Sequence, residues 1–125
     1  AVGVVAYSGY TAGAKKQAAK SNHSAVSKYI AAELQKCNLG NDKVMSDNLI
    51  CRGNTAAKTV TAAVKALADF KNPYSTSDAA VTSSGSYALG NTNLTAAGSQ
   101  IAIRSCFEDP CTDAANKSIT RVEIE

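Results

Sequence analysis

Apolar and polar side chains alternate with a helical period in the first third of the chain. Between residues 15 and 36 the apolar positions recur every three or four residues, and lysines and serines fill most of the others. The apolar positions are Ala18, Ala19, Ala25, Val26, Tyr29, Ile30 and Leu34. This period is typical of an amphipathic helix with one face in a core.

The start of the chain has a different pattern. Val2, Val4 and Val5 would cover every direction around a helix, as expected for a helix that is buried on all sides. The sequence has no proline before Lys36, and "KCNLGN" supplies typical helix-ending residues. We therefore predict one long helix over residues 2–36, whose environment changes along its length.

A second, shorter helix is predicted over residues 55–70. Asn54 or Thr55 can cap its start, an apolar stripe follows at helical spacing, and Asn72–Pro73 would end it. The segment between the two helices, "NLGNDKVMSDNLIC", reads as a loop.

Strand patterns appear only near the end of the chain. "QIAIRSCF" and "KSITRVEIE" both alternate between apolar and polar residues, and the turn-rich connector between them favours an antiparallel hairpin. The Ser-, Thr-, Asn- and Gly-rich stretch before them allows at most short strands near residues 80–82 and 86–89. The order predicts an α+β fold, in which a long N-terminal helix packs on a small antiparallel sheet.

Four cysteines add covalent constraints to this fold. An even number in a chain of 125 residues with many loops favours disulfides and an oxidising compartment. Three pairings are possible, and Cys37 with Cys51 and Cys106 with Cys111 are favoured because short loops close most easily. The alternative is a zinc site with four cysteine ligands, but only "CFEDPC" comes near the usual ligand spacing.

Charge is distributed unevenly along the chain. The net charge is +3, and residues 1–36 hold five lysines against the single acid Glu33. A lysine face formed by Lys16, Lys20 and Lys28 could meet phosphates, but without interleaved aromatic residues a solvated face is the better interpretation. Nucleic acid is therefore possible as a partner but not indicated.

Candidate chemistry is sparse. The one histidine, His23, has no carboxylate or cysteine at helical contact spacing and is expected to be a packing or exposed residue. Glu108, Asp109 and Asp113 could supply part of a calcium site, although a solvated acidic loop is the simpler interpretation. No nucleophile, phosphate-loop or metal-helix motif occurs. We expect no enzyme activity and no cofactor.

The opening stretch resembles a known family. "AVGVVAYSGYTAGAKKQAAKSNHSAVSKYIAAEL" is similar to the region of a bacterial type IV pilin just past the middle of its hydrophobic N-terminal segment, and the matching residues are Tyr7, Tyr10, Ala12, Lys15 and Lys16. The layout also agrees: a loop, a small sheet and a cysteine-bounded region follow the helix. "FKNPY" resembles a segment before the sheet in some pilins.

This resemblance implies a structural subunit of a pilus filament at the bacterial cell surface, serving adhesion, twitching motility or DNA uptake. Residues 1–36 would be the C-terminal part of the spine helix, and residues 37–125 the globular head. The residues in the filament core would be Val2, Val4, Val5, Tyr7 and Tyr10. The sequence is then expected to lack an N-terminal portion, which would lie in the inner membrane before assembly.

Copies of the same chain would be the main partners, with minor pilins and assembly machinery as further ones. The alternatives are a minor pilin, a type II secretion pseudopilin, whose major type often holds calcium near the C-terminus, and a free-standing secreted binding module.

Overall fold

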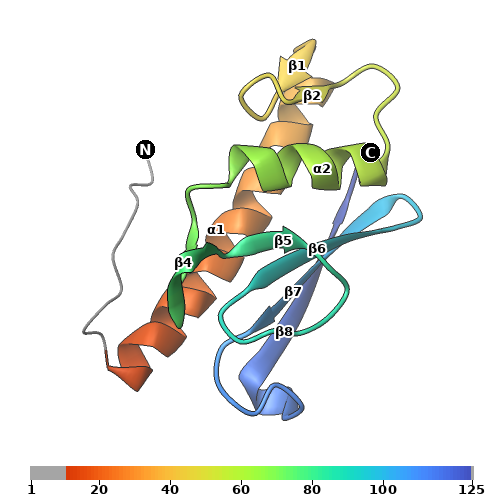
Figure 1. Cartoon of the computed structure of the whole chain (residues 1–125). Coiled ribbons are helices and arrows are strands. Elements are labelled where there is room, and N and C mark those ends of the chain that lie inside the picture. The colour runs from red at the N-terminus through yellow and green to blue at the C-terminus, as the bar shows by residue number, and fades with distance from the viewer. Residues whose placement is uncertain (1–10, 125) are drawn as a thin grey trace.

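The computed structural model describes residues 11–124. It is an α+β fold in which a long helix and a short helix pack against a four-stranded sheet (Figure 1). The elements are α1 (Ala12–Asn38), β1 (Lys43–Val44), β2 (Leu49–Ile50), α2 (Ala56–Ala66), β3 (Lys71–Asn72), β4 (Ser75–Ala79), β5 (Val81–Ser83), β6 (Thr92–Ala97), β7 (Gln100–Cys106), the 3₁₀-helix η1 (Ala114–Asn116) and β8 (Lys117–Glu123).

Helix α1 begins later than predicted. Thr11 has an extended backbone, with φ −70° and ψ 165°, and its hydroxyl accepts a hydrogen bond from the Ala14 amide at 3.2 Å. A threonine in this position caps a helix, so α1 starts at Ala12 and runs to Asn38, two residues beyond the predicted end. Residues 1–10 lie outside the described part of the chain. With them lie the predicted filament-core residues Val2, Val4, Val5, Tyr7 and Tyr10.

Helix α2 was predicted correctly in place but not in length. Thr55 caps it by accepting a hydrogen bond from the Lys58 amide at 3.2 Å, as expected. The helix ends at Ala66 rather than at residue 70. The carbonyl of Phe70 accepts from the Ala80 amide at 2.8 Å, because the chain has already turned toward the β3–β4 pair.

The four-stranded sheet has the order β5-β6-β7-β8. The predicted hairpin of β7 and β8 is confirmed, with register from Gln100↔Glu123 to Cys106↔Lys117. Strand β6 was not predicted, and β5 pairs with it in parallel, so the sheet is mixed rather than wholly antiparallel. Residues 86–89 do not form the expected strand; Leu89 makes only an isolated bridge to Cys106.

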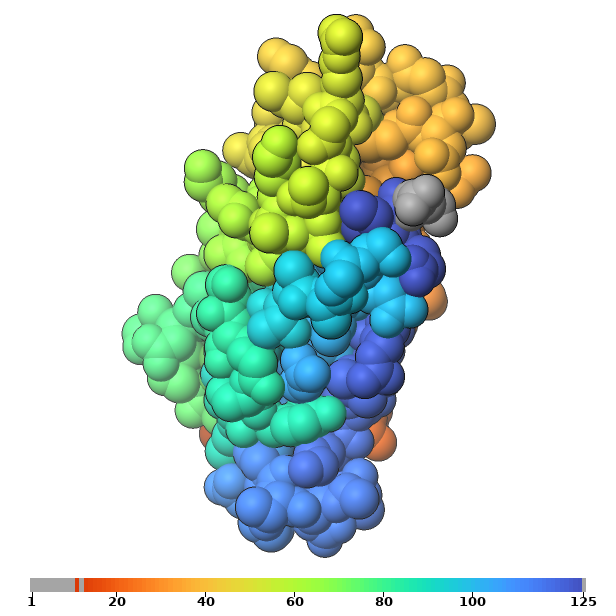
Figure 2. All heavy atoms as spheres, turned by 90° about the vertical axis from the view of Figure 1, so that its right-hand side faces the viewer, coloured from red at the N-terminus to blue at the C-terminus, as the bar shows by residue number. Residues whose placement is uncertain are grey.

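One hydrophobic core joins both helices to one face of the sheet. Ile30 of α1, Ala63 of α2 and Ile103 of β7 are each fully buried in it. Helix α1 packs mainly against β7 and β8, whereas α2 packs mainly against β6. Residues 37–51, which include β1 and β2, lie with α2 at one end of the molecule. Residues 107–116 lie at the other end (Figures 1 and 2).

Candidate functional site

His23 connects α1 to the sheet. Its Nδ1 lies 2.6 Å from the Ser105 hydroxyl and its Nε2 lies 2.8 Å from the Thr120 hydroxyl, so both ring nitrogens have partners on neighbouring strands. The edge-on ring of Phe107 stands 6.0 Å away, centroid to centroid. His23 is 8% exposed and Ser105 is 1% exposed, so the pair faces the interior instead of a cleft. The structure places His23 as a packing residue, one of the two roles expected from the sequence.

We expect acid to destabilise the fold through His23. Burial lowers the pKa of this histidine below its ordinary value of 6.5. The unfolded chain then binds a proton at a pH where the folded chain does not, so the free energy of unfolding falls as pH drops below about 6.5. Urea titrations between about pH 7 and pH 5 measure this slope.

His23→Gln is the control for this prediction. The variant should be less stable near neutral pH by about 1 to 2 kcal/mol. Because His23 is the chain's single histidine, the free energy of unfolding of the variant should also depend less steeply on pH. An equal slope in both proteins would contradict the assignment.

The β1–β2 hairpin is held in an unusual conformation. Met45, Ser46 and Asp47 have φ of 56°, 55° and 65°, a left-handed conformation that costs non-glycine residues about 1 kcal/mol each. Glu33 of α1 is buried, and its Oε1 accepts from the Met45 amide at 2.6 Å. Its Oε2 pairs with Lys36 at 2.6 Å, and this hydrogen bond raises the pKa of the Lys36 ammonium. The hairpin tip is thereby fixed to α1.

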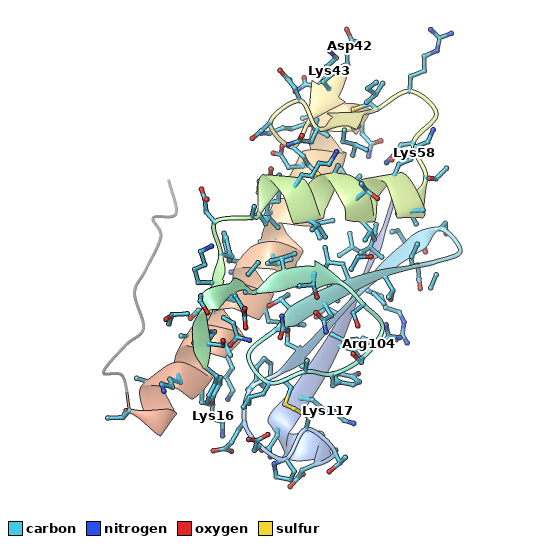
Figure 3. All side chains as sticks on the ribbon, viewed as in Figure 1. Lys16, Asp42, Lys43, Lys58, Arg104 and Lys117 are labelled. Atoms are coloured by element: carbon cyan, nitrogen blue, oxygen red, sulfur yellow. A yellow bond between two sulfur atoms is a disulfide. The ribbon has the colours of Figure 1, made fainter. Side chains whose placement is uncertain are left out.

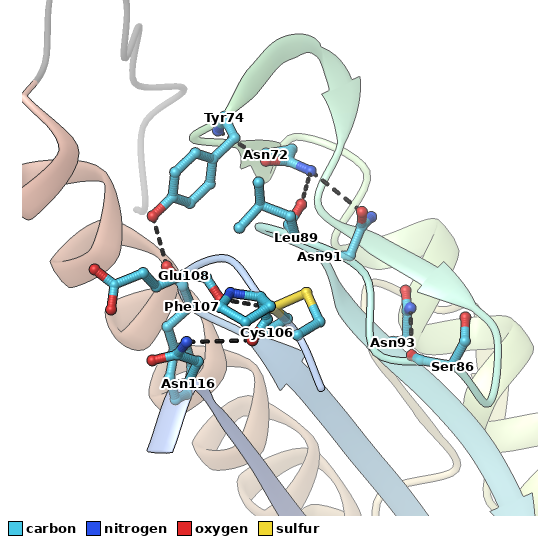
Figure 4. The surroundings of a disulfide bond; sticks show 12 residues. Asn72, Tyr74, Ser86, Leu89, Asn91, Asn93, Cys106, Phe107, Glu108 and Asn116 are labelled. Carbon is cyan, nitrogen blue, oxygen red and sulfur yellow. Dashed lines mark hydrogen bonds between the residues drawn. A yellow bond between two sulfur atoms is a disulfide. The ribbon is translucent and has the colours of Figure 1, made fainter. Parts of the chain in front are cut away.

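A buried asparagine joins three loop segments. Asn72 is 4% exposed; its amide donates to the Leu89 carbonyl at 2.9 Å and to Asn91 at 3.2 Å, and it accepts from the Tyr74 amide at 2.8 Å (Figure 4). The Tyr74 hydroxyl donates to the Phe107 carbonyl at 2.5 Å. The sequence indicated Asn72 only as the end of a helix, so this junction was missed.

The second cysteine pair closes a small loop at the end of the molecule. The Phe107 amide donates to the Asn116 carbonyl at 2.7 Å, and the Asn116 side chain donates to the Pro110 carbonyl at 3.2 Å. Asp113 accepts from the Ala115 amide at 3.0 Å and caps η1. These bonds and the disulfide give the loop a fixed shape that projects Asp109 into solvent.

The acidic residues of this loop do not converge. Glu108 pairs with Lys16 of α1 at 3.4 Å, whereas Asp113 caps η1. Within residues 11–124, no three His, Cys, Asp or Glu side chains gather closely enough to hold a metal ion. The possible calcium site at Glu108, Asp109 and Asp113 is therefore not assembled in this conformation.

The lysines of α1 are less free than a solvated face implies. Lys15 lies over the ring of Tyr74, 5.9 Å from its centroid, and Lys20 lies 5.8 Å from the centroid of Phe107. Together with the Lys16–Glu108 pair, they attach the start of α1 to the end of the molecule that holds residues 107–116. Figure 3 shows Lys16 at this end. Lys28, the third residue of the predicted face, is exposed.

A shallow groove lies at the opposite end, between β2 and α2. Its volume is about 450 Å³, and three cations, Arg52, Lys58 and Lys65, line it together with apolar residues such as Ala57 and Ala62. The other lining residues are Asn48, Leu49, Ile50 and Thr61. We call these nine residues the basic groove. The sequence did not indicate it, because its two walls come from separate segments.

Both favoured disulfides are present. Cys37 pairs with Cys51, and Cys106 pairs with Cys111, each with 5.5 Å between the α-carbons. Because all four cysteines form disulfides, they are not the ligands of the zinc site that was the alternative prediction. The two bonds fix the loops at opposite ends of the molecule, near the basic groove and the acidic residues respectively.

Comparison with protein-family models, curated proteins and solved structures gave no match. Within the part of the chain that the structure describes, no helix combines the length and apolar character needed to cross a bilayer.

Proposed function

We propose that the chain is the globular part of a filament subunit of the type IV pilin class, with its helix directed to the filament core and its head displayed outside. The observation that carries this proposal is the two-sidedness of α1. Val26 and Ile30 are fully buried against the sheet, whereas Ser24, Lys28 and Ala31 on the other side are exposed. A helix of 27 residues that offers a free face along its length suits packing against copies of itself.

The apolar start of the sequence supports the same function. The first six residues have no polar side chain, and in the sequence they lie five residues before the end of α1 that Lys15, Lys16 and Lys20 attach to the head. In this proposal the apolar segment belongs to the helical bundle, and assembly depends on it.

The test is assembly with and without more of the apolar segment. We expect the encoding gene to continue upstream of Ala1 with a longer apolar run that carries a glutamate. We expect the extended protein to form filaments visible by electron microscopy. The 125-residue chain should form none at physiological salt. Long filaments from this chain alone, or an upstream sequence without an apolar run, would contradict the proposal.

A pseudopilin is the second candidate within this class. The sequence observation that favours it is the group Glu108, Asp109 and Asp113 beside the C-terminal cysteines. Because these acids do not converge in the structure, calcium would have to rearrange the loop. A large rise in melting temperature with added calcium would favour the pseudopilin, and an unchanged melting temperature would favour the pilin.

A further inference from the structure

A groove at one end of the molecule and a loop at the other carry opposite charge, and lysines of α1, among them Lys16, lie beside the loop. At one end the basic groove is concave and contains three cations and no carboxylate among its lining residues. At the other end Glu108, Asp109 and Asp113 lie on the loop 107–113, which the Cys106–Cys111 disulfide closes. We call residues 107–113 the acidic loop. The two features lie far apart along the long axis of the molecule (Figure 2).

The groove offers both cations and apolar contact. Ile50 is 59% exposed at its edge, which is unusual for so large an apolar side chain. Lys58 uses one of its three donors on the Gly53 carbonyl at 3.2 Å, so two remain. Arg52 and Lys65 are exposed. A partner with two or three carboxylates and a small apolar surface would match these contacts.

The acidic loop offers the carboxylates and the small apolar surface that would match the groove. Asp109 and Pro110 are exposed next to each other, and Glu108 keeps 46% of its side chain exposed although it pairs with Lys16. The disulfide, the η1 cap and the three hydrogen bonds of Asn116 to Phe107, Pro110 and Asp113 hold the backbone in one conformation. A preorganised loop loses little conformational entropy when it docks.

We propose that the acidic loop of one copy of this chain docks into the basic groove of the next copy. The inference rests on the proposed filament function and names a contact between heads. Because the two surfaces differ and lie at opposite ends, the contact is heterologous and repeats without closing, so it generates a linear array. The contact area is small, so we expect isolated heads to associate weakly. In a filament the helical bundle would hold neighbouring heads at a high effective concentration, and the weak contact would then form.

The test is a charge exchange between the two surfaces. The loop variant is Glu108→Lys/Asp109→Lys, which spares the cap at Asp113, and the groove variant is Arg52→Glu/Lys65→Glu. Each variant alone places like charges in contact. We expect its self-association, measured by sedimentation in a concentration series at low ionic strength, to be at least about tenfold weaker than that of the unaltered chain.

Mixing the two variants gives the decisive result. In an equimolar mixture the lysine loop faces the glutamate groove, and the remaining acidic loop faces the remaining basic groove. Both contacts of an alternating array are then complementary, and we expect association to return. Raising the salt from about 0.02 M to about 0.3 M should weaken it, because exposed charges are screened.

A matched control changes the same amount of charge elsewhere. Arg121→Glu alters one exposed residue outside both surfaces and is matched to the single groove change Lys65→Glu; it should leave the association unchanged. Thermal melting checks folding, and the single changes Asp109→Lys and Lys65→Glu replace any double variant that does not fold.

Three results would overturn the inference. They are an unaltered chain that stays monomeric at low salt up to millimolar concentration, association that neither variant weakens, and a mixture no better than its components. Each of these would leave filament formation by the upstream-extended protein as a separate question, so failure of the head contact is distinguishable from failure of the proposed function.

Discussion

Replacing Gly90 with alanine is expected to destabilise the fold by about 3 kcal/mol. Gly90 has φ +77°, in the left-handed region that residues with a side chain rarely adopt. A Cβ at this position would lie 1.9 Å from the Asn72 Oδ1 and 2.7 Å from its Cγ. Asn72 cannot move away without cost, because it is buried and bonded to Leu89, Asn91 and Tyr74.

Gly98→Ala is the matched control for this prediction. Gly98 also has a positive φ, +63°, but a Cβ there meets nothing within 4 Å. It should therefore cost only about 1 kcal/mol, the backbone part of the effect. Urea denaturation of both variants measures the difference. Equal losses would mean that the Asn72 contact adds nothing.

A double-mutant cycle locates the clash. If the alanine at position 90 acts through Asn72, then the loss for Gly90→Ala combined with Asn72→Ala should be clearly smaller than the sum of the two single losses. An additive result would assign the cost to the backbone alone.

The sequence predicted those parts of the fold that local patterns determine. The period of Val26, Ile30 and Leu34 predicted the buried face of α1, and all three are in the core. The alternation around Ile101 and Ile103 predicted β7 and its hairpin partner. Each of these elements has its own hydrophobic period, so no distant contact was needed to recognise it.

Strand β6 was missed because its buried residues are largely polar. Asn93 is 2% exposed, and its amide donates to the Ser86 carbonyl at 2.8 Å while its oxygen accepts from Thr82. Asparagine is normally a turn residue, and only these partners from neighbouring segments make its burial favourable. A local pattern contains no information on such partners.

The candidate interaction surfaces were missed for a related reason. The basic groove combines Arg52, which follows β2, with Lys58 and Lys65 of α2. In the sequence these cations are separated by other residues and form no pattern. They line one groove only because the segment after the Cys37–Cys51 loop places Arg52 beside α2. The acidic loop, by contrast, is contiguous, and its charge could be noted directly.

Removing the Cys37–Cys51 disulfide is the other change with a large expected effect. The bond joins the last turn of α1 to the residue after β2, with a sequence separation of 14. In the chain-entropy model, closing a loop of this length stabilises the fold by about 3 kcal/mol, against about 2 kcal/mol for the shorter loop at Cys106–Cys111. We expect Cys37→Ser/Cys51→Ser to lower the free energy of unfolding by more than Cys106→Ser/Cys111→Ser does.

The local consequences should be larger than this difference suggests. The closed loop contains the left-handed residues Met45, Ser46 and Asp47, whose conformation depends on the Met45–Glu33 hydrogen bond and on the fixed loop ends. Hydrogen exchange of Cys37→Ser/Cys51→Ser should be faster than in the unaltered chain, and the increase should be larger across residues 39–54 than in α1 or β7. Unchanged protection there, or a smaller loss of stability than in Cys106→Ser/Cys111→Ser, would show that the hairpin is held by its packing and not by the disulfide.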